Sequence, residues 1–168
     1  MKNEIRNINQ SVLEGKVDTP EFYWQIQRMA ASIINKRYGR GVWRQATLSQ
    51  ELLSAAMIGT YAALKKYNAE KGEFLSYARI FMFGEMHIVY CQHVFGLTPY
   101  YASMRKHVLD SLAIYYENHD LNILYDNIRH FHIAKSTICT LYSKNKLDLD
   151  EANICISVIE QFKKSGLH

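Results

Sequence analysis

The chain of 168 residues is long enough for one domain, or for one domain and a small appendage. Its hydrophobic content of 48% predicts a packed core and excludes wholesale disorder, and a total of two prolines and eight glycines favours long helices over a turn-rich β fold. The positive charge is concentrated in the first two-thirds of the chain, and its densest group is Lys36, Arg37, Arg40 and Arg44. A polyanion is expected to bind there; the alternative is that these cations only form a solvated helix end and loop.

The first half of the chain shows three helical patterns. Thr19-Pro20-Glu21 marks the start of the first with an N-cap hydroxyl, a proline and an acid, and apolar residues then recur at helical spacing over 21–38. A second pattern covers 50–67 and ends at the turn-rich segment 68–72. The third, 74–95, is apolar nearly all round, so it is expected to be buried or bound on several sides. We expect these three helices to pack as one bundle.

The second half of the chain also predicts helices. Thr98-Pro99 repeats the cap and the proline and starts a helix that runs to about Tyr115. Asp120 is expected to cap another helix, which can continue past Ile138, and Asp150 to cap a last one. No segment alternates at period two, so the predicted fold class is all-α. We divide the chain into a helical domain at 1–96 and a C-terminal helical module at 97–168.

Few residues suggest catalysis or metal binding. His87 and Cys91 lie four residues apart on one face of a predicted helix, but a structural zinc site needs four ligands in two close pairs and no second pair follows. The sequence has no phosphate-binding loop, no dinucleotide-binding glycine motif and no H-E-x-x-H motif. We therefore expect no metal, no cofactor and no enzyme activity.

The sequence predicts neither a signal peptide nor a membrane span. The residues after Met1 are polar, and no run of about eighteen apolar residues occurs. The cysteines fit no paired disulfide framework and no C-x-x-C site. A cytoplasmic location is therefore expected, with reduced and mostly buried thiols at Cys91, Cys139 and Cys155.

An ordered run of motifs spans roughly residues 21–110. Segments 51–59 (ELLSAAMIG) and 65–72 (KKYNAEKG) resemble the pattern D-L-x-Q-x-G-x-I-G-L followed by A-x-x-x-F/Y-D-P-x-x-G. Segment 74–78 (FLSYA) follows where that pattern has F-x-T-Y-A. Segment 84–86 (GEM) falls at R-G-A-M or R-G-E-I, and 97–99 (LTP) at V-P-R, with a basic helix after it. In these motifs the chain resembles region 2 and the start of region 3 of the sigma-70 family of RNA polymerase sigma factors.

This resemblance implies two binding surfaces. The helix at 50–67 would dock on the coiled coil of the largest catalytic subunit of core bacterial RNA polymerase, and the matching positions are Glu51, Ser54, Ala55, Met57 and Tyr61. The following loop and helix would face the promoter −10 element, where unpaired bases stack on aromatic rings and cations hold phosphates. The matching positions there are Lys71, Phe74, Tyr77, Arg79, Phe81, His87, Arg105 and Lys106. Phe74 could equally be a core residue, whereas we expect Tyr77 to be partly exposed.

The chain also departs from the family pattern. Its loop at 72–77 is one residue shorter, and Glu73 adds a negative charge beside the expected DNA path. Phe83 stands where the family carries an arginine, and His87 replaces a polar base-reading residue. These changes predict promoter contact that is weakened, altered or partly supplied by a second protein.

The C-terminal part does not resemble the sigma region that binds the −35 element. Segment 133–138 is only weakly similar to a helix-turn-helix, and residues 108–168 carry six Lys/Arg against eight Asp/Glu. We therefore expect a protein-contact or packing module there, and a second protein as the source of any −35 contact.

Two hypotheses follow from the sequence. In the first, the chain is a divergent sigma-like factor that binds core polymerase and helps to recognise or melt a −10-type element. The basic first two-thirds and Tyr77 favour it. In the second, it is a helical interaction module, an anti-sigma protein or polymerase-appropriating adaptor, which docks without reading a promoter. Glu73 and Phe83 favour that alternative.

Overall fold

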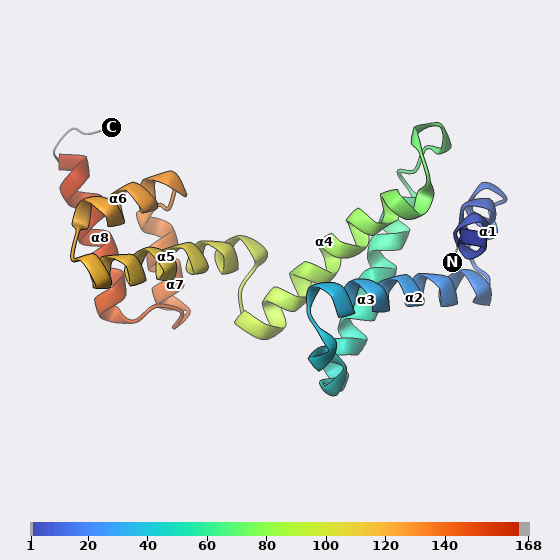
Figure 1. The fold of residues 1–168 in the computed structure, drawn as a ribbon, viewed down its shortest axis with the longest axis horizontal. Coiled ribbons are helices and arrows are strands. Elements are labelled where there is room, and N and C mark those ends of the chain that lie inside the picture. The colour runs from blue at the N-terminus through green and yellow to red at the C-terminus, as the bar shows by residue number, and fades with distance from the viewer. Residues whose placement is uncertain (1, 165–168) are drawn as a thin grey trace. The chain divides into compact units, whose positions relative to one another are not determined.

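The fold is all-α, as predicted. The computed structural model describes residues 2–164, with side chains from Ile8 onward, and these residues form helices and no strand. The chain divides into two compact units, Met1–Gly96 and Leu97–His168 (Figure 1). No helix in the described range has the length and apolar character needed to cross a membrane.

The N-terminal unit contains the three predicted helices and one that was not predicted; the second predicted helix spans Ala46–Leu64 and not 50–67. The unpredicted helix is α1, and Ile8 on it is buried in the core. The start of α2 is confirmed, because the Phe22 amide donates to the Thr19 hydroxyl oxygen at 3.2 Å. The elements of this unit are α1 (Lys2–Leu13), α2 (Pro20–Arg37), the 3-10 turn η1 (Arg40–Arg44), α3 (Ala46–Leu64), the 3-10 turn η2 (Ala69–Lys71) and α4 (Phe74–Phe95).

Helices α3 and α4 form a closely packed antiparallel pair at the centre of this unit. Glu51 near the start of α3 contacts His93 near the end of α4, and Gly59 in the middle of α3 faces Met82 in the middle of α4. A Cβ atom on Gly59 would lie 2.7 Å from the backbone of Met82, so only glycine allows this approach. Helix α1 packs against both α2 and α4, and α2 packs against α3. The fully buried core side chains of the unit include Phe22, Ile26, Ile34, Leu48, Leu52, Phe74, Met82 and Met86.

The C-terminal unit contains α5 (Pro99–Asn118), α6 (Leu121–His130), α7 (Lys135–Ser143) and α8 (Leu149–Lys164). Asp120 caps α6 as predicted, since its carboxylate accepts from the Asn122 amide at 2.8 Å. The prediction that this helix can continue past Ile138 was wrong. It ends where His132 adopts a left-handed φ of 52° and the Ile133 amide donates back to the Ile128 carbonyl at 2.9 Å.

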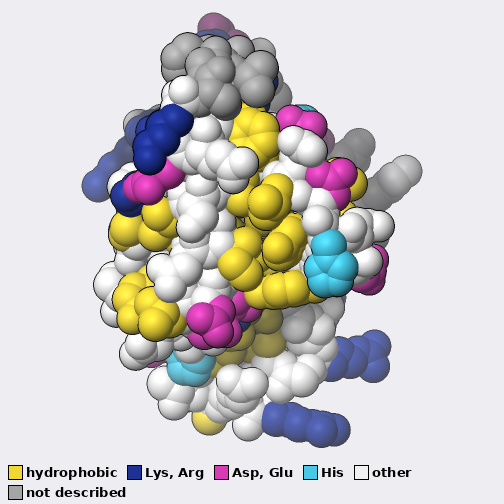
Figure 2. Space-filling view, turned by 90° about the vertical axis from the view of Figure 1, so that its left-hand side faces the viewer, with side chains coloured by type: hydrophobic (Ala, Val, Ile, Leu, Met, Phe, Trp, Pro, Cys, Tyr) yellow, Lys and Arg dark blue, Asp and Glu magenta, His cyan; other side chains and the backbone are white. Residues whose placement is uncertain are grey.

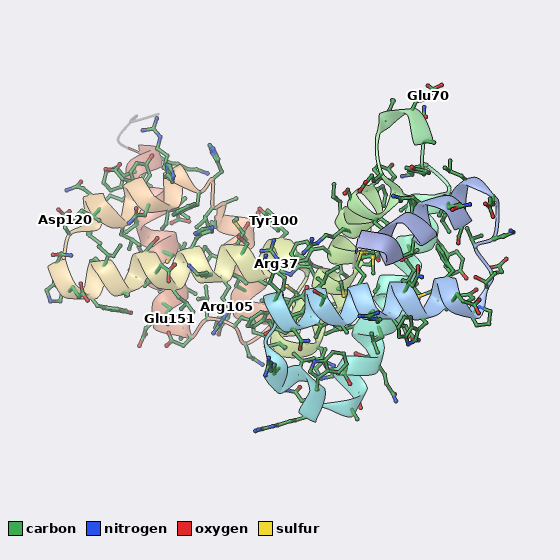
Figure 3. The ribbon with its side chains drawn as sticks, turned by 45° about the vertical axis from the view of Figure 1, so that its right-hand side comes forward. Arg37, Glu70, Tyr100, Arg105, Asp120 and Glu151 are labelled. Atoms are coloured by element: carbon green, nitrogen blue, oxygen red, sulfur yellow. The ribbon has the colours of Figure 1, made fainter. Side chains whose placement is uncertain are left out.

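The last helix begins two residues earlier than predicted. The Glu151 amide donates to the Asp148 carboxylate at 2.8 Å, and the Asp148 amide donates to the Glu151 carboxylate at 2.9 Å. This reciprocal pair is a capping box, so Asp148 and not Asp150 is the N-cap of α8. Figure 3 labels Glu151 on this helix and Asp120 at the start of α6.

The C-terminal unit has a core of its own, in which the four helices meet. Two stacked ring pairs tie helices together: His107 against Phe131 at 3.8 Å between ring centres, and Tyr125 against Phe162 at 4.0 Å. Hydrophobic side chains also gather on the face of this unit seen in Figure 2. Among the described residues of this unit, the exposed large hydrophobic ones are Tyr100, Ile114, Tyr116, Leu121, Ile123, Tyr142 and Leu149.

Two of the three cysteines are buried. Cys91 and Cys155 lie inside, whereas Cys139 is exposed on α7. Burial raises the pKa of both inner thiols, that of Cys155 to about 12.

Candidate functional site

One face of α3 is exposed and carries apolar side chains. Glu51, Ser54, Ile58 and Tyr61 follow one another at intervals of three or four residues, so they form a single stripe along the helix. The Ile58 side chain is 60% exposed and that of Tyr61 is 39% exposed. Beside this stripe lies a shallow groove of about 380 Å³, whose lining consists of Thr47, Gln50, Glu51, Ser54, Ala55, Ile58 and Val89. We call these residues, with Tyr61, the α3 face.

The structure changes the composition of the predicted docking surface. Ala55 is only 3% exposed, because it points toward the α4 side of the helix, and Met57 is half-buried against the core. Neither side chain is at the centre of the exposed stripe. Ile58 takes that place, and the motif comparison did not select it, although its spacing from Ser54 and Tyr61 was a usable signal.

Side-chain contacts hold both ends of the α3 face in place. At one end the Glu51 carboxylate lies 3.2 Å from the Nδ1 atom of His93. At the other end the hydroxyls of Tyr61 and Tyr23 are 2.5 Å apart, which links α3 to α2. The hydrogen bond to Tyr61 is the main reason why the pKa of Tyr23 rises to about 12. These two contacts tie the ends of the α3 face to α4 and to α2.

An aromatic cluster lies where the α3–α4 loop meets α4. The Tyr77 ring centre is 6.1 Å from that of Tyr67 and 4.9 Å from that of Phe81, and the Lys66 ammonium lies over the Phe81 ring at 5.8 Å. Tyr77 and Phe81 are both half-buried, so each keeps part of its ring at the surface. The Tyr67 hydroxyl donates to the Gly72 carbonyl at 2.7 Å and fixes the loop beneath the cluster.

Phe74 and Arg79, which the resemblance implies for DNA binding, add no exposed group to this cluster. Phe74 is fully buried, with its ring against Tyr67 and Phe22, so it is a core residue and has no surface for a base. Arg79 is exposed but lies two residues from Phe81, and two residues on a helix point in nearly opposite directions. Lys66, which the motif comparison did not select, places its ammonium group beside the Phe81 ring. Lys71 is exposed at the end of η2.

A second ring stack occupies another side of α4. The Phe83 and His87 rings stack with their centres 5.5 Å apart, and the Arg37 guanidinium lies over Phe83 at 4.9 Å. Figure 3 labels Arg37 at the end of α2. The cation over Phe83 comes from a different helix, since Arg37 belongs to α2.

The remaining predicted residues belong to the C-terminal unit. The Arg105 Nε atom donates to the Lys146 carbonyl at 2.9 Å, so this side chain holds the α7–α8 loop to α5. Lys106 is exposed and forms an ion pair with Asp110 at 2.8 Å, one turn later on α5.

The described residues contain no group of three or more His, Cys, Asp or Glu side chains placed to hold a metal ion.

Comparisons of this chain with protein-family models, with curated proteins and with solved structures give no match.

Proposed function

We propose that this chain is a sigma-like transcription factor, which docks on core bacterial RNA polymerase through the α3 face and offers the aromatic cluster to an unpaired −10-type promoter strand. The proposal is supported by the motif resemblance together with the placement of two separate surfaces on one antiparallel helix pair. It involves no catalysis by the chain itself.

The exposed Ile58 is the observation that carries the docking step. An isoleucine that leaves 60% of its surface in water, with an exposed tyrosine one turn away, is the kind of apolar group that marks a protein interface. Ile58 and Tyr61 form the apolar part of the stripe, and polar residues flank them, with Glu51 and Ser54 on one side and Lys65 beyond Tyr61 on the other. A small apolar centre with a polar rim is the usual anatomy of a protein contact, and a coiled coil is narrow enough to lie along a single helix face.

The aromatic cluster supports the strand-binding step. Partly exposed rings next to cations suit single-stranded nucleic acid, because bases stack on rings while cations contact phosphates. Tyr77 and Phe81 supply the rings, and Lys66 supplies the charge.

A second protein completes the proposal. The C-terminal unit has no excess of positive charge, yet it exposes isoleucine, leucine and tyrosine side chains. We assign to it the contact with a partner that binds the −35 element.

The docking step is tested by measuring the affinity of the chain for core polymerase. Ile58→Arg places a charge at the centre of the α3 face and should lower the affinity by at least about tenfold, since central apolar contacts dominate interfaces. Ile80→Arg is the matched control, because Ile80 is 70% exposed on α4 and lies outside the α3 face. Equal affinities for wild type and Ile58→Arg would contradict the docking proposal.

The adaptor function is the second candidate, and two observations favour it. Phe74 is buried and offers no ring to DNA, and Glu73 is exposed next to the aromatic cluster. An adaptor would bind polymerase through the same α3 face but would not respond to the sequence of the melted strand. Transcription from a pre-melted promoter with a varied non-template strand separates the two candidates.

A further inference from the structure

Helix α2 carries an exposed basic groove on a different face of the N-terminal unit. The groove has a volume of about 550 Å³ and lies between α2 and the 3-10 turn η1. Its lining consists of Arg28, Ala31, Ser32, Asn35, Lys36 and Arg40. Three of these six side chains are cations and none is an acid, so the groove presents a positive surface.

The two tryptophans of the chain both border this groove. Trp24 is 54% exposed and holds the Arg28 guanidinium 4.7 Å from its ring centre. Trp43 is 39% exposed, and its indole N–H donates at 2.7 Å to the Asn35 side chain of the groove. Each indole leaves a large flat apolar area at the surface, which a ligand with flat apolar faces can cover.

The charges along the groove point to a polyanion. No ion pair joins Lys36 or Arg40 to an acid in the part of the chain that the structure describes. The Arg40 guanidinium can meet a phosphate with two N–H donors. An acidic peptide would satisfy the charges, but it would leave both indoles without a flat partner.

We propose that this groove binds single-stranded nucleic acid, with Arg28, Lys36 and Arg40 on the phosphates and the exposed indoles against bases. A positive groove with aromatic rings at its borders is the general solution for binding such strands without sequence readout. This site is separate from the α3 face and from the aromatic cluster, and it requires no polymerase.

The free full-length chain is sufficient for the test. Because Trp24 and Trp43 are the only tryptophans, tryptophan fluorescence reports on this groove alone. Titration with a single-stranded thymidine oligonucleotide should quench it, and the affinity should fall about 20-fold between about 50 and 200 mM salt, as expected for three phosphate contacts. A duplex of equal length and polyglutamate serve as the comparison ligands.

Variants are compared by the anisotropy of a labelled oligonucleotide, after circular dichroism has shown that they remain helical. Lys36→Ala with Arg40→Ala should reduce the same salt effect to about threefold, and Trp24→Ala should weaken binding by about fivefold or more. Lys163→Ala with Lys164→Ala removes the same charge from exposed positions on α8 and should change little. The proposal is overturned by absence of binding, by equal losses in the two double variants, or by polyglutamate or duplex binding as tightly as the single strand.

Discussion

The close approach of α3 and α4 depends on Gly59, and replacing it with alanine is a direct test of the packing. The added Cβ would lie 2.7 Å from Cα and N of Met82 and from the carbonyl carbon of Phe81. All three are backbone atoms, so no rotation of a side chain can relieve the contact. Reaching an ordinary separation of 3.4 Å requires the two helices to move apart by about 0.7 Å.

The size of the effect follows from two opposing contributions. Overpacking a core costs about 1–3 kcal/mol, and the upper end applies here because backbone has to move. Alanine is favoured over glycine inside a helix by about 1 kcal/mol, which offsets part of that cost. We expect Gly59→Ala to lower the free energy of unfolding by about 2 kcal/mol. For a unit of this size the melting temperature should then fall by roughly 8–16 °C.

Gly84→Ala is the matched control for this substitution. Gly84 is also inside a helix, but a Cβ there would have no atom within 4 Å. Only the helix preference remains, so Gly84→Ala should raise the free energy of unfolding by roughly 0.5–1 kcal/mol. Thermal melting followed by far-ultraviolet circular dichroism measures both variants. If Gly59→Ala melted at or above the wild-type temperature, the described packing of α3 on α4 would be incorrect.

Three further predictions concern other parts of the chain. Phe74→Ala should lower the free energy of unfolding by about 3–5 kcal/mol in denaturant titrations, because Phe74 is fully buried. Tyr77→Ala should lower it much less, and equal losses would contradict the placement of these rings. Asp148→Ala removes the N-cap of α8 and should lower the free energy of unfolding by about 1 kcal/mol in the same assay. Asp150→Ala, two residues later, should lower it by less. The reverse order would move the cap to Asp150. At about pH 8 a thiol reagent should modify Cys139 rapidly, and it should modify Cys91 and Cys155 only after unfolding. Burial keeps the pKa of both inner thiols above the ordinary value. Fast reaction of all three thiols would contradict this prediction.

The sequence predicted the start of a helix well where a capping residue or a proline marks it, and the end of a helix where a turn-rich segment follows. Thr19-Pro20 and Asp120 start helices as expected, and the turn-rich segment 68–72 separates α3 from α4. The break between α6 and α7 was missed because no glycine or proline marks it, and its left-handed residue is His132. Helix α1 was missed because polar residues dominate 2–13, although Ile8 and Val12 are spaced for a helix face.

The candidate surfaces were harder to predict, since they depend on which side of each helix is covered. The pattern at 74–78 left Phe74 open between a core role and a base-binding role, and the structure buries it. The expected partial exposure of Tyr77 is confirmed. Contacts between segments that are distant in the chain could not be predicted from the sequence. Arg37 lies over Phe83 and Lys66 over Phe81 only because the helices pack as they do. Ile58, by contrast, could have been selected from helical spacing alone.

Binding to a pre-melted promoter by core polymerase, with and without this chain, tests the proposed function most directly. Single abasic sites are placed in turn along the non-template strand, and the affinity of the complex is measured at each position. We expect the chain to raise the affinity and to create sensitivity at one or two −10 positions, worth roughly 1–3 kcal/mol per stacked base. Tyr77→Ala should remove that sensitivity. An affinity that is the same with and without the chain, or that responds to no position, would contradict the proposal.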